Sequence, residues 1–203
     1  MRILIFGDSI TYGRVDSLGG WVTRLRKHFD AQGENNNRDF PSIYNQGISG
    51  DSAEDILERF DVETNARLEE DNCFVLAVGT NDSSLENGKP RYTEAQFREN
   101  FEKIIKKMKV LSLKILIVGL LPVDENLTTP IPWRPTRHYT NKQVLAFDKI
   151  VKDVADSNQL PYVPLFDAFK DKLELFPDGL HPGDEGHQIV AELVIPELEK
   201  LLK

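Results

Sequence analysis

Cysteine is almost absent from this chain, since Cys73 is the only one among 203 residues. A single cysteine excludes an intramolecular disulfide and any metal site built from several thiolates. Cys73 also lies in the apolar stretch NCFVLAVG, where we expect a buried strand position and no nucleophilic role. Disulfide-stabilised scaffolds and thiolate metal centres are therefore excluded.

Long apolar runs and an excess of positive charge are absent as well. No stretch reaches the roughly 18 apolar residues that a membrane-spanning helix needs, and the N-terminal MRILIF is shorter than the core of a signal peptide. We therefore expect no membrane span and a cytoplasmic location. The 25 basic and 33 acidic residues give a formal charge of −8, the opposite of what nucleic-acid binders carry. We expect no nucleic-acid partner, and no pattern in the sequence specifies an oligomeric state.

The chain does contain a regular alternation of short apolar runs with longer amphipathic segments, and no internal repeat interrupts it. Strands are expected at residues 2–6, 42–45, 73–78, 114–118 and 162–164. Helices are expected at residues 20–29, 53–60, 93–111, 140–158 and 184–202. Parallel strands need crossover helices that cover both faces of a sheet. The pattern predicts one α/β domain over residues 1–203, with a mainly parallel five-stranded sheet.

Unusual polar stretches directly follow several of the predicted strands. GDS follows the first strand, GISGDS the second and GTND the third, while DGLHP lies beyond the fifth. Open parallel sheets bind ligands beyond the carboxyl ends of their strands. We therefore expect these four stretches to meet at one edge of the sheet.

The residue types in these stretches are typical of acyl transfer. A serine hydroxyl needs a base to remove its proton, and that base needs a third group to fix its tautomer. Ser9, His181 and Asp178 suit these roles, because Asp178 precedes His181 by only three residues. Donors for the oxyanion would be the backbone N–H groups of Ser9 and Gly50 and the side-chain amide of Asn81.

The order and spacing of these stretches resemble the SGNH hydrolases, also called GDSL-type esterases and lipases. The resemblance rests on GDS at residues 7–9, the glycine at position 50, GTND at 79–82 and DGLHP at 178–182. The first block reads Gly-Asp-Ser-Ile where leucine is commoner in the family. The resemblance implies a flavodoxin-like three-layer α/β/α sandwich and chemistry without a cofactor or a metal ion.

The same resemblance implies roles for individual residues. Ser9 would be the nucleophile and one oxyanion donor, with Gly50 and Asn81 as the other two donors. Asp178 and His181 would supply the acid and the base of the triad.

The segment 119–138, after the fourth predicted strand, matches no block of the family. We expect it to border the substrate pocket as a variable loop, with Trp133 and His138 as possible substrate contacts. Trp133 lies among prolines, so anchoring a rigid loop is an equal alternative for it. His28 and His187 lie in predicted helices and are expected to be non-catalytic.

These patterns predict a serine esterase that cleaves small or soluble esters or thioesters through an acyl-enzyme. Asp8 and Asp82 would then support the site from positions next to Ser9 and Asn81. An alternative is a phosphoryl-transfer domain that uses Asp8, Asp82 and Asp51 with a metal ion, although Ile10 stands where the dehalogenase-type pattern needs a second aspartate. A catalytically silent binding module of the same fold is a further alternative.

Overall fold

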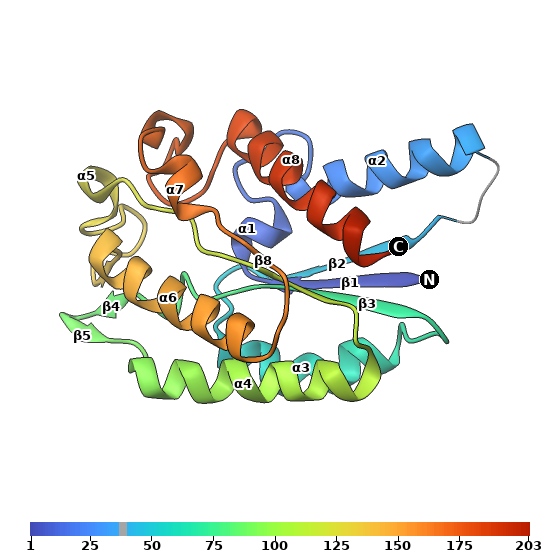
Figure 1. Ribbon diagram of the computed structural model, residues 1–203. Coiled ribbons are helices and arrows are strands. Elements are labelled where there is room, and N and C mark those ends of the chain that lie inside the picture. Colours follow the sequence, from blue (N-terminus) through green and yellow to red (C-terminus); the bar gives the residue numbers. More distant parts are fainter. Residues whose placement is uncertain (37–39) are drawn as a thin grey trace.

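A five-stranded parallel sheet forms the centre of the computed structural model, which describes residues 1–36 and 40–203 (Figure 1). Its strands, in spatial order, are β2 (Ser42–Gly47), β1 (Arg2–Gly7), β3 (Asn72–Ala77), β6 (Ile115–Val118) and β8 (Tyr162–Val163). All four neighbouring pairs are parallel. This strand order is that of the flavodoxin-like folds, and it confirms the predicted α/β class.

Long helices cover both faces of this sheet (Figure 1). One face carries α3 (Ala53–Asn65), α4 (Glu94–Leu111) and α6 (Asn141–Ser157), and the other carries α2 (Gly20–Asn36) and α8 (Asp184–Leu201). Alternate side chains of β1 serve the two layers, because Leu4 and Phe6 pack toward α3 whereas Ile3 and Ile5 pack toward α2. The result is a three-layer sandwich with two apolar layers.

Helix α4 shows how the sequence sets these layers. Thr93 caps its first turn, and its hydroxyl and the Gln96 side chain form a reciprocal capping box. The apolar positions recur at spacings of three and four and are all buried: Phe97, Phe101, Ile104, Ile105 and Met108. Burying each such side chain contributes about 1.5–3 kcal/mol relative to leaving it exposed. One face of α4 therefore fixes the helix against the sheet.

Two helices extend further than their apolar pattern predicts. Helix α2 continues to Asn36 where an end at residue 29 is expected, and α3 continues to Asn65 where an end at residue 60 is expected. In both, the added residues are mostly polar, while no proline interrupts the backbone hydrogen bonds. Each helix therefore continues through polar residues beyond the segment that packs on the sheet, because no proline ends it.

Several elements of two to four residues are too short to leave a periodic pattern and were not predicted. They are the helices α1 (Ser9–Tyr12), α5 (Glu125–Thr128) and α7 (Phe166–Phe169), the 3-10 turn Leu173–Leu175, and the strands β4 (Leu85–Glu86), β5 (Lys89–Pro90) and β7 (Arg137–His138). The three short strands form a second, antiparallel sheet in the order β5-β4-β7. This sheet joins the segment after β3 to the segment between β6 and α6.

Cys73 is fully buried in β3, and burial raises the pKa of its thiol to about 12, so the group stays protonated. Across residues 1–36 and 40–203, no helix is both long enough and apolar enough to cross a bilayer.

Candidate active site

The turn between β1 and α1 positions Ser9. Asp8 caps α1 and accepts a hydrogen bond from the backbone N–H of Ile10 at 2.9 Å, which makes Ser9 the first helical residue. A side chain at Gly7 would place its Cβ 2.1 Å from Oγ1 of Thr11, so only glycine lets α1 lie this close to the strand. The sharp turn leaves Ser9 beyond the carboxyl end of β1, with 7% of its surface exposed.

The Ser9 hydroxyl lies at one end of a chain of hydrogen bonds that runs through His181 to Asp178. Ser9 Oγ is 2.8 Å from Nε2 of His181, and His181 Nδ1 is 2.7 Å from Oδ2 of Asp178. Because a carboxylate only accepts, Nδ1 carries the proton and Nε2 is free to accept the serine proton.

Asp178 is held in place by its own backbone. Its Oδ1 accepts hydrogen bonds from the N–H groups of Leu180 and His181 at 3.0 and 2.8 Å. Partial burial opposes ionisation of Asp178, but the hydrogen bonds from the His181 ring and from these N–H groups lower its pKa below the ordinary value. The carboxylate is therefore charged at neutral pH and orients the imidazole.

Three hydrogen-bond donors predicted for an oxyanion lie around the same cavity, which Ser9, Gly50 and Asn81 all line. Ser9 begins α1, where the first N–H groups have no acceptor within the helix. Gly50 has a φ of +94°, which other residues rarely adopt, and a Cβ placed there would meet nothing within 4 Å. Backbone conformation, and not packing, is what requires glycine at position 50.

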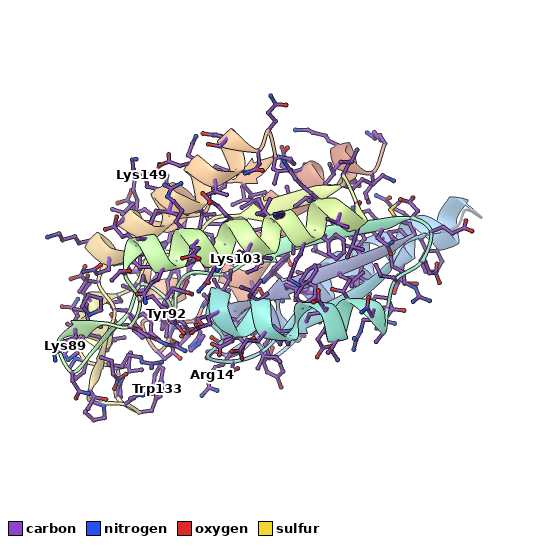
Figure 2. The ribbon with its side chains drawn as sticks, turned by 90° about the horizontal axis from the view of Figure 1, so that it is seen from below. Arg14, Lys89, Tyr92, Lys103, Trp133 and Lys149 are labelled. Atoms are coloured by element: carbon purple, nitrogen blue, oxygen red, sulfur yellow. The ribbon has the colours of Figure 1, made fainter. Side chains whose placement is uncertain are left out.

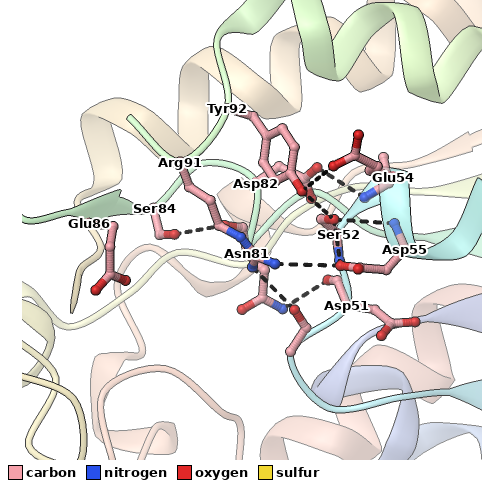
Figure 3. Close-up of polar contacts among 12 residues, drawn as sticks. Asp51, Ser52, Glu54, Asp55, Asn81, Asp82, Ser84, Glu86, Arg91 and Tyr92 are labelled. Atoms are coloured by element: carbon pink, nitrogen blue, oxygen red, sulfur yellow. Dashed lines mark hydrogen bonds and ion pairs between the residues drawn. The ribbon is translucent and has the colours of Figure 1, made fainter. Parts of the chain in front are cut away.

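The Asn81 amide is fixed at both ends. Tyr139 donates its hydroxyl proton to Oδ1 of Asn81 at 2.9 Å, and Nδ2 of Asn81 donates to the backbone carbonyl of Asp51 at 3.1 Å. Figure 3 shows Asn81 beside Asp51 at the start of α3. An amide nitrogen carries two protons, so Nδ2 keeps one for a ligand.

The two predicted supporting aspartates are both buried. Asp82 accepts a hydrogen bond from the N–H of Ala53, the first residue of α3, at 3.0 Å, and within the described residues its Oδ2 has no partner. Burial raises the pKa of Asp82 to about 7 and that of Asp8 to about 6. Asp82 thereby joins the segment that carries Asn81 to the segment that carries Gly50 (Figure 3).

The cavity at this edge has a volume of about 260 Å³. Its lining residues come from five separate segments: Ser9, Arg14, Ser49, Gly50, Asn81, Ile131, Trp133, Arg134, Arg137, Tyr139, Leu180 and His181. Trp133 is half exposed, and its ring stacks on His181 with 6.0 Å between the centroids. Segment 119–138 thus contributes four of the residues that line the cavity.

The cavity contains most of the predicted residues, but not all of them. His138 is not part of its lining, because β7 pairs His138 with Leu85 in the second sheet. Tyr139 and the three arginines at positions 14, 134 and 137 line the cavity but were not predicted from the sequence. Two of these arginines and the tyrosine stand in the stretch WRPTRHY, whose charge was the available signal.

The family of the chain follows from comparison with known proteins. The family model described as GDSL-like Lipase/Acylhydrolase matches residues 5–189. The chain belongs to this family of hydrolases, as its sequence motifs predicted.

Solved structures of similar proteins share the fold. A lipase/acylhydrolase from Enterococcus faecalis is 25% identical, with a TM-score of 0.77 over 98% of this chain and 95% of that one. The acetylxylan esterase Axe2 from Geobacillus stearothermophilus is 20% identical, with a TM-score of 0.75 over 97% and 93% of the two chains. The chain is also 30% identical over 130 residues to the uncharacterized lipoprotein YqeF of Bacillus subtilis (strain 168), a match that covers 61% of this chain and 49% of that protein. The match therefore spans about half the length of this relative.

In the part of the chain that is described, no three or more His, Cys, Asp or Glu side chains are arranged to hold a metal ion.

Proposed function

We propose that this protein is a serine esterase that hydrolyses small carboxylic esters through an acyl-enzyme on Ser9. The observation that supports this most directly is the hydrogen-bonded series of Ser9, His181 and Asp178, with distances of 2.8 and 2.7 Å. Such a series supplies a nucleophile, its base and the group that orients the base.

The first half of the reaction forms the acyl-enzyme. Nε2 of His181 removes the proton of Ser9 while Oγ attacks the ester carbonyl carbon. The negative charge then develops on the former carbonyl oxygen, toward the N–H groups of Ser9 and Gly50 and the amide of Asn81. Collapse of this tetrahedral intermediate breaks the bond to the leaving oxygen, which takes the proton from His181 and departs as the alcohol.

The second half regenerates the enzyme. Water attacks the acyl carbon while His181 removes a proton from the water. The bond between the acyl carbon and Oγ of Ser9 then breaks, Oγ takes that proton from His181, and the acyl group departs as the carboxylic acid. Throughout both steps the charged Asp178 stabilises the protonated imidazole. The scheme needs side chains and backbone of this chain alone.

The cavity favours compact substrates, because about 260 Å³ accommodates a small acyl or alcohol group rather than a long chain. Ile131 and Trp133, which line the cavity from segment 119–138, would contact that group. Small oxyesters, thioesters and acetylated sugars all fit this description, and the structural neighbour Axe2 is itself an acetylxylan esterase.

The phosphoryl-transfer alternative is not favoured, because none of its three carboxylates lines the cavity formed by the described residues. Asp8 caps α1, Asp82 accepts from the α3 backbone, and Asp51 pairs with Arg59 at 2.7 Å. A catalytically silent protein would not need an aligned Ser9 and His181.

Covalent labelling tests the proposal. A fluorophosphonate should modify Ser9 in one-to-one stoichiometry, as measured by mass spectrometry of the intact protein and its peptides. Ser9→Ala should lose the label and nearly all hydrolysis of p-nitrophenyl acetate, whereas Ser49→Ala, a change in a second serine of the same cavity, should retain the label at Ser9. Labelling that persists in Ser9→Ala, or hydrolysis that a chelator abolishes, would contradict the mechanism.

A further inference from the structure

Three arginines, at positions 14, 134 and 137, line the cavity that contains Ser9, and among the described residues no aspartate or glutamate lines it. This composition is opposite to that of the whole chain, which has a formal charge of −8. A single-sign cavity attracts ligands of the other sign. The three guanidinium groups therefore favour an anionic ligand, provided that nearby carboxylates do not neutralise them.

Glu86 neutralises only part of this charge. Its Oε2 lies 3.2 Å from Nε of Arg134 and 2.9 Å from Nε of Arg137, so two guanidinium groups share one carboxylate. Hydrogen bonds from the Thr136 hydroxyl and then from Arg137 lower the pKa of Glu86, which is therefore ionised. The pair retains one positive charge in excess.

The other carboxylates near the site are engaged elsewhere. Asp178 is bonded to the His181 ring, and Asp51 is paired with Arg59. Asp8 is buried as the cap of α1 and is not part of the cavity lining. None of these carboxylates forms an ion pair with Arg14.

Arg14 has a fixed backbone and a free side chain. Its N–H donates to the carbonyl of Ser9 at 3.0 Å, and its carbonyl lies 3.4 Å from Nε2 of His187. Its guanidinium is exposed and forms no ion pair or side-chain hydrogen bond with any described residue. Arg14 and Trp133 lie near each other at the lower edge of the view in Figure 2, in agreement with their shared cavity.

We propose that this cavity selects esters that carry a negative charge close to the scissile bond, with Arg14 as the main specificity residue. A guanidinium binds a carboxylate or a phosphate through paired hydrogen bonds, and Trp133 offers a flat wall to the group between that anion and the ester. Arg134, at the rim, adds the excess charge that Glu86 leaves. The inference rests on the proposed esterase function and names the substrate class for the same site.

A matched set of esters tests this selectivity. 4-Acetoxybenzoate and 4-acetoxybenzamide differ in charge but hardly in shape, and 4-acetoxyphenyl phosphate extends the comparison to a phosphate. For the wild type, kcat/KM for the acid should exceed that for the amide by about threefold or more, given what exposed charge pairs contribute. The relative rates of carboxylate and phosphate esters then show which anion the site prefers.

Variants assign the preference to Arg14. Arg14→Gln should lower the ratio of kcat/KM between acid and amide about two- to fivefold, and Arg14→Lys should restore part of it. Arg26→Gln, at another exposed arginine, on α2 and outside the cavity, should leave the ratio at its wild-type value. A wild-type ratio of one or less, or equal ratios for Arg14→Gln and Arg26→Gln, overturns the proposal.

Binding measurements separate this inference from the esterase function. In the Ser9→Ala background, calorimetry should detect tighter binding of 4-acetoxybenzoate than of 4-acetoxybenzamide, and adding Arg14→Gln should weaken the acid selectively. If fluorophosphonate fails to label Ser9 while this difference is present, the esterase mechanism fails and the anion site stands. If Ser9 is labelled and the two ligands bind equally, the anion site fails and the mechanism stands.

Discussion

At the scale of single residues, the geometry around Asn81 indicates a donor that is oriented before any substrate binds. Tyr139 and the carbonyl of Asp51 hold the two ends of its amide. A donor fixed in advance needs no reorganisation when negative charge develops on the substrate. Tyr139 would then act through Asn81, as a positioning residue.

A double-mutant cycle tests this coupling. Asn81→Ala should lower kcat by about 10²–10³ with a smaller change in KM, because the donor matters most in the transition state. Tyr139→Phe should lower kcat by about tenfold, because the loss of one hydrogen bond frees the amide to rotate. In the Asn81→Ala background, Tyr139→Phe should have little further effect on kcat.

Tyr92→Phe is the matched control, because the Tyr92 hydroxyl contacts Ser52 and Glu54 outside the cavity. Steady-state kinetics on p-nitrophenyl acetate give all the required values. If Tyr139→Phe were equally harmful with and without Asn81, Tyr139 would act on the substrate directly or on the fold.

The site residues that could be predicted from the sequence are those that belong to a recognisable short stretch of neighbouring residues. Asp178 and His181 share one turn, and Gly50 and Asn81 lie within a few residues of the ends of predicted strands. Tyr139 could not be assigned in this way, because its contact with Asn81 spans 58 positions and depends on the pairing of β4 with β7. The same pairing sets Glu86 opposite Arg137.

At the scale of elements, Asp82 connects two segments of the site. It accepts from the first N–H of α3, although Ser52 already caps that helix. A buried carboxyl at a helix N-terminus gains from the N–H groups there, but loses more by desolvation, so its pKa rises to about 7. Relative to the unfolded chain, the fold is therefore more stable while Asp82 is protonated.

The free energy of unfolding should therefore depend on whether Asp82 is ionised. In the unfolded chain Asp82 titrates near about 3.9, whereas in the folded protein it titrates near 7. Its favourable contribution is complete below the unfolded pKa and is lost as the pH rises through the folded pKa. Asp82→Asn keeps an acceptor for Ala53 without the titration, so its stability relative to the wild type should increase between about pH 5 and about pH 8.

Thermal unfolding of both proteins at the two pH values measures this effect. Glu70→Gln, which removes a carboxylate from an exposed position, serves as the control. A difference between Asp82→Asn and the wild type that stays constant with pH would mean that burial does not perturb Asp82.

Element length decides what the sequence could predict at this scale. Helix α4 combines five apolar positions with a capping box, and its predicted bounds agree with the structure within one residue. Helix α1 and strand β7 have only four and two residues, so they leave no period. Those short elements nonetheless carry Ser9 and Arg137 to the cavity.

At the scale of the whole molecule, the site joins parts of the chain that are 172 positions apart, as Ser9 and His181 are. The packing of α8 against α2 on one face of the sheet brings them together (Figure 1). The predicted cytoplasmic location stays a prediction, and one relative of the chain is described as a lipoprotein.

His187 is a fully buried polar side chain within this packing. Its Nδ1 accepts from the N–H of Trp21 in α2 at 3.3 Å, which leaves Nε2 to donate to the carbonyl of Arg14 at 3.4 Å. The ring is fully buried, and burial lowers the pKa of His187 below its ordinary value of 6.5. At pH values between the folded and the unfolded pKa, His187 is therefore neutral in the folded protein and protonated in the unfolded chain.

Acidification should reveal this contact. The stability that the neutral ring contributes is complete above the unfolded pKa of about 6.5, and it is lost as the pH falls toward the lower folded pKa. His187→Gln should be less stable than the wild type by about 1–3 kcal/mol near pH 7.5, because it disrupts buried hydrogen bonds. The gap should narrow toward about pH 5, by at most about 1.4 kcal/mol for each pH unit, because only the wild type loses this contribution.

Urea unfolding at both pH values measures the gap, and the raised pKa values of Asp8 and Asp82 cancel because both proteins contain them. A gap that is the same at both pH values would mean that His187 titrates alike in the folded and unfolded chains, so that the contact between α8 and α2 does not depend on its neutral form.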